Sequence, residues 1–145
     1  MITSYAYIAD DIQILQGGKP VAFGLYPDHV LVLNVPPGMP SKINDATPAA
    51  LNGLSILITI VGLEPGERTV TPSLLLPNGK QGPQQIVPMQ LLVKPGGAAN
   101  LTFRFTPFVV PQAGKYVLKV PIDGEEVTFT FEVRIVQPEP AAIAA

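Results

Sequence analysis

Few side chains in this sequence could carry out chemistry. Catalysis needs a positioned acid, base or nucleophile. His29 is the only histidine, and it follows Pro27 and Asp28 at the expected start of a strand. There is no cysteine and no serine in a nucleophile-elbow motif. We therefore expect a structural role for His29, and we predict a chain that has no catalytic residues and is not an enzyme.

Metal binding has only a weak basis in the sequence. Zinc would need more histidine or cysteine ligands. Calcium binds clustered carboxylates, which loops between strands can supply. The candidates are Asp10, Asp11, Asp28, Asp45, Asp123, Glu125 and Glu126. Adjacent carboxylates on a strand point to opposite faces, so Asp10 and Asp11 would not chelate one ion. We expect no metal and no cofactor.

Three tyrosines are candidates for sugar binding, which uses exposed aromatic rings. They are Tyr5, Tyr7 and Tyr26, and there is no tryptophan. Packing in the core or at a sheet edge is the favoured alternative for all three. The paired glycines at 17–18 and 96–97 are typical of turns rather than of a phosphate loop. The nine basic residues are scattered singly, which argues against nucleic acid as a partner.

The strongest structural pattern is a hairpin over residues 112–136. Its first half places Tyr116, Leu118 and Val120 on one face, and its second half alternates in the same way around Phe129 and Phe131. Alternation with period two predicts strands that are buried on one face. Asp123 and Gly124 between them favour a type I′ turn, which needs positive φ at both positions. An isolated hairpin is marginal, so the remaining chain must supply a partner sheet.

The remaining chain contains further short strands separated by turn residues. The expected strands cover residues 3–16, 19–25, 29–35, 54–63, 68–76, 86–93 and 99–106. A two-residue turn is expected at 17–18, and the run 54–63 is apolar on both faces, as in a strand covered on both sides. Pro72 and Pro88 favour edge strands or breaks. About eight or nine strands without a convincing helix predict an all-β fold, an antiparallel immunoglobulin-like β-sandwich.

Two segments differ from this pattern. Residues 36–52 have turn residues throughout, with a helical turn possible at 49–51, and so long a loop is a candidate contact surface. Residues 137–145, QPEPAAIAA, have a linker composition. We therefore predict one β-sandwich domain over 1–136 and a Pro/Ala-rich tail over 137–145.

The amino-acid composition limits which kinds of partner the chain can be expected to bind. Charged residues make up 14% of the 145 residues, against roughly 25% in ordinary soluble domains. A surface so poor in charge favours packing against other proteins. The net charge of −2 gives no reason to expect nucleic acid or membrane as a partner. The N-terminal residues lack the pattern of a signal peptide, so a cytoplasmic location is expected.

Several segments together resemble a group of small, uncharacterised bacterial proteins with an immunoglobulin-like or C2-like sandwich. These segments are YAYIAD at 5–10, GK at 18–19, the apolar run 54–63, EPGE at 64–67, LPNG at 76–79, 111–116 and DGE at 123–125. The likeness covers most of residues 3–136, and it implies the fold but no activity.

We therefore expect a non-enzymatic protein that acts by protein–protein contact, as a structural or accessory subunit of a larger assembly or by self-assembly. An accessory protein of a bacteriophage capsid or tail is one alternative, and its location would then be the virion. A small-ligand or carbohydrate-binding module is the other.

Overall fold

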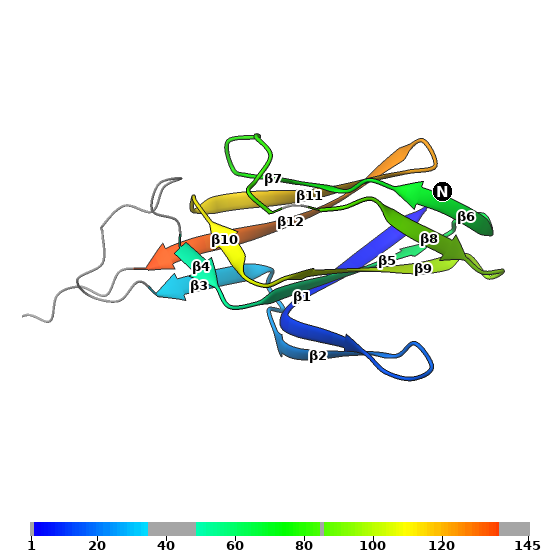
Figure 1. The fold of residues 1–145 in the computed structure, drawn as a ribbon, viewed down its shortest axis with the longest axis horizontal. Helices are drawn as coiled ribbons and strands as arrows, with labels where there is room; N and C mark the ends of the chain where they lie inside the picture. The colour runs from blue at the N-terminus through cyan, green and yellow to red at the C-terminus, as the bar shows by residue number, and fades with distance from the viewer. Residues whose placement is uncertain (1, 35–48, 85, 137–145) are drawn as a thin grey trace, which may run out of the picture.

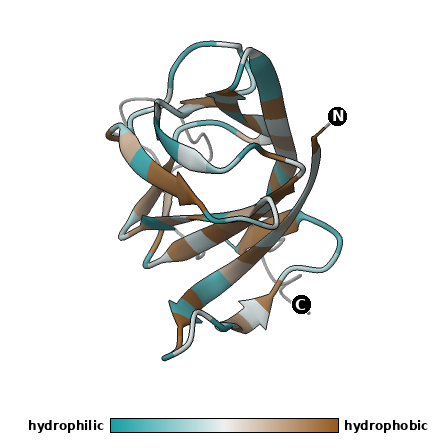
Figure 2. Ribbon diagram, turned by 90° about the vertical axis from the view of Figure 1, so that its right-hand side faces the viewer, coloured by the Kyte–Doolittle hydropathy of each residue, from teal (hydrophilic) through white to brown (hydrophobic). Residues whose placement is uncertain are grey.

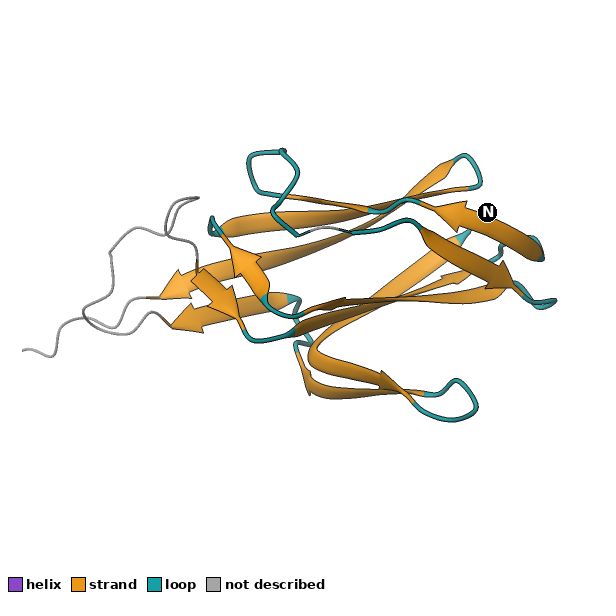
Figure 3. Cartoon of the chain, viewed as in Figure 1, coloured by secondary structure: helices purple, strands orange, loops and turns teal. Residues whose placement is uncertain are grey.

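The computed structural model describes residues 2–34, 49–84 and 86–136, and there the chain consists of strands and turns. Figure 3 shows no helix in these ranges, so none of the described residues belongs to a helix able to cross a membrane. The first six strands are β1 (Thr3–Ile14), β2 (Pro20–Leu25), β3 (Val30–Asn34), β4 (Ala49–Leu51), β5 (Leu54–Val61) and β6 (Gly66–Val70). The others are β7 (Ser73–Leu75), β8 (Met89–Val93), β9 (Ala98–Phe105), β10 (Phe108–Val110), β11 (Gly114–Ile122) and β12 (Glu125–Val136).

The described strands form several sheets whose pairs are mostly antiparallel. One four-stranded sheet has the order β2-β1-β5-β9, and another has the order β3-β12-β11-β7. Strands β10 and β4 form a two-stranded sheet, as do β6 and β8. Strand β3 is the exception in direction, because it runs parallel to β12. In Figure 1, β11 and β12 run above β1, β5 and β9.

A single large apolar core joins residues from both four-stranded sheets. Its aromatic centre runs from Phe105 on β9 through Phe108 on β10 to Tyr116 and Phe131, with ring centroids 5.4 to 6.0 Å apart. Figure 2 shows hydrophobic positions concentrated on the strands and hydrophilic ones in many of the connecting loops. Burial of large aromatic and branched side chains is the main force that stabilises this arrangement.

The strongest sequence patterns are confirmed. Asp123 and Gly124 both have positive φ, 50° and 76°, and Ile122 pairs with Glu125 across the turn. Every residue of β5 from Leu54 to Ile60 is buried, as expected of a strand covered on both faces. On β9, alternate side chains starting at Ala99 are buried, in the predicted register.

The break favoured at Pro72 is confirmed: the segment 68–76 divides there, where the missing N–H interrupts the ladder, into β6 and β7, which pair with β8 and β11 in different sheets. Two other local predictions are wrong. Residues 49–51 form strand β4 instead of a helical turn, because they pair with β10. The turn after β1 is longer than two residues, since Leu15 N donates to the Lys19 carbonyl at 2.8 Å. The division at Pro72 and the short strands β4 and β10 give twelve strands in the described residues instead of about nine.

Strand β1 changes partner along its length, and this positions the candidate site. Residues 3–9 pair with β5, Ala9 also pairs with β2, and residues 11–14 pair only with β2. Beyond Ala9 the strand bends away from β5, and in Figure 1 the end of the β1–β2 hairpin projects from the lower side of the molecule. The hairpin therefore offers surface that the rest of the sheet does not cover.

Candidate functional site

The histidine and the carboxylates are not brought together. His29 has a φ of 58°, and its ring packs edge-on against Phe129 with the centroids 4.9 Å apart. Its carbonyl accepts the backbone N–H of Glu132 at 2.9 Å. Among the described residues, no group of three or more His, Asp or Glu side chains is close enough to hold a metal ion. Asp45, a calcium candidate, lies outside the described residues.

Each of the other aspartates already has a partner. Asp10 accepts a hydrogen bond from the Tyr26 hydroxyl, and Asp11 lies 3.6 Å from the Arg104 guanidinium. These two adjacent carboxylates thus serve different partners, as predicted from their position on a strand. Asp123 forms an ion pair with Arg68.

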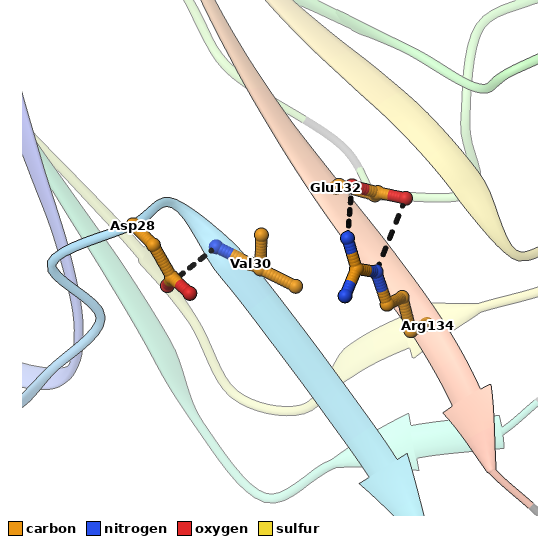
Figure 4. Close-up of polar contacts among 4 residues, drawn as sticks. All are labelled: Asp28, Val30, Glu132 and Arg134. Atoms are coloured by element: carbon orange, nitrogen blue, oxygen red, sulfur yellow. Dashed lines mark hydrogen bonds and ion pairs between the residues drawn. The ribbon is translucent and has the colours of Figure 1, made fainter.

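Carboxylates near the parallel pair of strands β3 and β12 also bond to nearby donors (Figure 4). The Asp28 carboxylate turns back to accept the backbone N–H of Val30 at 3.2 Å, which fixes the start of β3. On the neighbouring β12, both oxygens of Glu132 accept from Arg134 at 3.3 Å. Both carboxylates therefore satisfy local donors, and the two do not converge on a shared point.

The β1–β2 hairpin carries the largest group of exposed apolar side chains. Six of them are between 46% and 51% exposed, and we call them the hairpin surface: Tyr5, Tyr7, Ile14, Leu15, Phe23 and Leu25. The rings of Tyr5 and Tyr7 meet edge to face, with centroids 6.1 Å apart. Single exposed apolar residues are common, but a group on one supersecondary element is typical of an interaction site.

Strand register places Tyr5, Tyr7 and Leu25 on the outer face of the first sheet, the face opposite the core. Directly paired residues share a face. Tyr7 pairs with Leu57, and Ala9 pairs with Leu25 on one side and Ser55 on the other. Leu57 and Ala9 form a small second cluster with Ile12, separate from the main core. The bent end of the hairpin therefore shields part of this outer face.

A cleft opens beside this cluster. It has a volume of about 330 Å³ and is mainly apolar in lining. Its walls are Tyr7, Ile12, Pro20, Ala22, Leu25 and Leu57. An apolar concavity of this size suits a side chain of a partner or a small apolar molecule.

A polar contact holds the bend of the hairpin. Gly24 has a φ of 68°, and a Cβ at this position would collide with the Asp10 carboxylate. That carboxylate lies over Gly24 and accepts a hydrogen bond from the Tyr26 hydroxyl. Burial, then this hydrogen bond and the negative charge of Asp10, raise the pKa of Tyr26 to about 12. Tyr26 is thus a structural anchor and does not offer a free ring for sugar stacking.

Two other hollows are lined by both polar and apolar residues. One, of about 430 Å³, lies between the β6 segment around Arg68 and the β11–β12 turn, where Asp123 neutralises the arginine. The other, of about 500 Å³, is bordered by residues from Pro72 to Pro88. Gln84 lines it, and its amide nitrogen donates to the Val109 carbonyl at 2.6 Å. The described residues that line these two hollows include no histidine.

The sequence identified part of the hairpin surface. The sequence indicates Tyr5 and Tyr7 as candidates, and the structure exposes both. The sequence predicts only a strand around Phe23 and Leu25, although the segment PVAFGL at 20–25 contains no charge, which is a signal of an apolar edge. The predicted contact loop 36–52 lies outside the described residues except for 49–52, where Ala49–Leu51 form β4. The tail 137–145 also lies outside them.

No protein-family model matches this chain, and no curated protein matches it in sequence. The resemblance to small bacterial sandwich proteins therefore stays a prediction.

Proposed function

We propose that this chain is a non-enzymatic, immunoglobulin-like β-sandwich that acts by protein–protein contact, as a structural or accessory subunit of a larger assembly. The hairpin surface is the observation that carries this proposal. Its six apolar side chains are half-exposed on one hairpin, beside an apolar cleft. Contact with another protein would remove this area from water, at roughly 25 cal/mol per Å² of apolar surface.

Three features support the sandwich. Residues of both four-stranded sheets share one core, as the two inner faces of a sandwich do. Near the start of β11 the Tyr116 hydroxyl donates to the Gln112 carbonyl at 2.6 Å, a contact typical of the tyrosine corner in immunoglobulin-like folds. The chain also passes from one four-stranded sheet to the other, since β5 lies in the first and β7 in the second.

Charge favours a protein partner over nucleic acid or membrane. Arg68, Arg104 and Arg134 each contact a carboxylate, so these guanidinium groups do not form a free basic patch. Phosphate binding depends on clustered free cations. The paired carboxylates also favour a chain without catalytic, metal or cofactor sites.

Two alternatives follow from specific observations. The low charge and the hairpin surface would equally suit an accessory protein of a bacteriophage capsid or tail, located in the virion. The cleft beside Tyr7 and Leu57 favours a small-ligand or carbohydrate-binding module, although the edge-to-face packing of Tyr5 on Tyr7 does not provide a flat stacking platform.

The test compares two variants of the whole chain. Tyr7→Ser with Leu25→Ser removes apolar area from the hairpin surface, whereas Thr130→Ser changes an exposed residue on β12. We expect light scattering to show concentration-dependent association of the wild type, weakened about tenfold or more by the double substitution and unchanged by Thr130→Ser. Equal association of all three would contradict the proposal. A monomer that binds an apolar dye or a sugar panel through Tyr7 would favour the ligand-binding alternative.

A further inference from the structure

Strand β9 is the last strand of the first sheet. It pairs with β5 along its whole length, from Ala98–Val61 to Phe105–Leu54. On its other side, no strand in the described ranges pairs with it, and none of the turn or loop backbone groups described there bonds to residues 98–105. Within the described ranges its outward N–H and C=O groups therefore have no backbone partner, as in an edge strand that can accept another strand. Strand β8, which precedes β9 in the chain, lies close to it without pairing.

The other sheet edges are shorter or are protected. Strand β2 begins with Pro20, which lacks an N–H, and Gly24 breaks its regular path with positive φ. Strand β7 has three residues and β3 has five. In contrast, β9 has eight residues without proline, glycine or positive φ. Natural proteins usually protect edges with the devices that β2 has and β9 lacks.

Two polar side chains of β9 that could block pairing at its free edge instead contact β1 and β5, the neighbouring strands of the same sheet. The Arg104 guanidinium donates to the Ile12 carbonyl at 2.6 Å and lies 3.6 Å from Asp11, both of them on β1, beyond β5. The amide oxygen of Asn100 accepts the hydroxyl proton of Thr59 on β5 at 2.7 Å. An unengaged charge at the edge would discourage a second strand, and here the only charge on β9 is held elsewhere.

We propose that β9 is a pairing edge for a second copy of this chain. Two β9 strands join antiparallel about a twofold axis that passes through Thr102, which makes one continuous sheet across both copies. This inference rests on the proposed function, protein–protein contact, and adds a second interface to the hairpin surface. In such an isologous contact, if one residue of the first copy contacts a given residue of the second, the reverse contact also forms.

The proposed register is one of those that keep apolar side chains opposite apolar ones and separate the two Arg104 charges. With Thr102 opposite itself, Leu101 faces Phe103 of the other copy, which continues the apolar row of the core side. On the outer side Asn100 faces Arg104 of the other copy, so no like charges lie opposite each other. A shift by one residue would place polar side chains opposite apolar ones, which the two-residue period of the strand disfavours.

A cysteine scan tests the register, because the chain has no cysteine of its own. Directly opposite residues of an antiparallel pair have Cβ atoms about 4.5–5.5 Å apart, so a small backbone shift brings them to the spacing of about 3.5–4.5 Å that a disulfide needs. We expect Thr102→Cys to form a disulfide-linked dimer under mild oxidation at least about tenfold faster than Ala98→Cys, which is off the axis. Thr130→Cys on β12 is the control for random collision. Equal rates at all three positions would overturn the proposed register.

A charge on the axis tests the interface itself. Thr102→Lys places two ammonium groups opposite each other, so the dissociation constant measured by analytical ultracentrifugation should rise about tenfold or more. The matched Thr130→Lys should leave it unchanged, and circular dichroism verifies that both variants keep their strands. Association that survives Thr102→Lys but is lost in Tyr7→Ser/Leu25→Ser overturns this inference and leaves the proposed function standing. Wild-type protein that stays monomeric at high concentration overturns the β9 pairing as well.

Discussion

Tyr116 is the polar residue most deeply placed in the core. It is fully buried, yet its hydroxyl reaches the Gln112 carbonyl at 2.6 Å, and its ring stacks on Phe131 with centroids 5.5 Å apart. A buried phenol needs such a partner, because an unsatisfied hydroxyl in an apolar core is costly. This one contact ties the loop before β11 to the centre of the core.

Removing the Tyr116 hydroxyl should destabilise the protein without creating a large cavity. We expect Tyr116→Phe to lower the free energy of unfolding by about 1–2 kcal/mol, because the Gln112 carbonyl loses its donor. Urea unfolding at neutral pH measures this change. Tyr5→Phe, at a half-exposed ring, should change the free energy by less than about 0.5 kcal/mol. Equal effects of the two substitutions would show that the Tyr116 contact does not stabilise the fold.

The same hydroxyl should make the fold sensitive to alkali. Burial raises the pKa of Tyr116 to about 12, although the bond to the Gln112 carbonyl opposes this. The unfolded chain loses the proton near pH 10 and the folded chain near pH 12, so the protonated phenol favours folding. Stability from this group is complete below pH 10 and falls as the pH rises from 10 to 12. Tyr116→Phe should flatten this fall.

At the scale of elements, the β1–β2 hairpin shows how one glycine permits a bend. The Asp10 carboxylate occupies the space that a Cβ at position 24 would need, and Gly24 itself has a φ of 68°. The Asp10–Tyr26 hydrogen bond then links the end of β2 to the bend of β1. The orientation of the hairpin surface depends on this arrangement.

Gly24→Ala should therefore destabilise the hairpin in two ways. The left-handed backbone alone costs roughly 1–2 kcal/mol for a residue with a Cβ, and the clash with Asp10 adds to this cost. Asp10→Ala removes the clash but also the hydrogen bond to Tyr26. In a double-mutant cycle of thermal unfolding, the two changes together should destabilise less than the sum of the single ones, by about 0.5 kcal/mol or more. Additive effects would show that Asp10 does not lie over Gly24.

Local patterns predicted the elements better than their pairing. The 112–136 hairpin, the doubly covered β5 and the alternation of β9 follow from side-chain period and turn residues alone. The parallel pairing of β3 with β12 and the different sheets of β6 and β7 join residues far apart in the chain, and no local pattern encodes them. The side-chain alternation of β2 also does not predict which of its faces is exposed to solvent. The exposure of Phe23 and Leu25 is therefore seen only in the structure.

For the whole molecule, the two proposed contacts lie at opposite edges of one sheet. The hairpin surface belongs to β1 and β2, and the pairing edge is β9, with β5 between them. A chain with two different interfaces can build assemblies larger than a dimer, because each copy contacts two neighbours. With 14% charged residues and a net charge of −2, little electrostatic repulsion would oppose such growth. These properties suit a structural subunit.

The shared core also predicts how the molecule unfolds. Phe131 is 1% exposed on β12, and Phe108 beside it also contacts Phe105 of the other four-stranded sheet, so the two sheets should lose their structure together. Far-UV circular dichroism and tyrosine fluorescence should then give the same urea midpoint. Phe131→Ala should lower the free energy of unfolding by about 3–5 kcal/mol and shift both midpoints equally. Thr130→Ala, on the exposed face of the same strand, should change it by less than about 0.5 kcal/mol. Separate midpoints for the two probes would mean that the sheets unfold independently, and the single core would not be the unit that stabilises both.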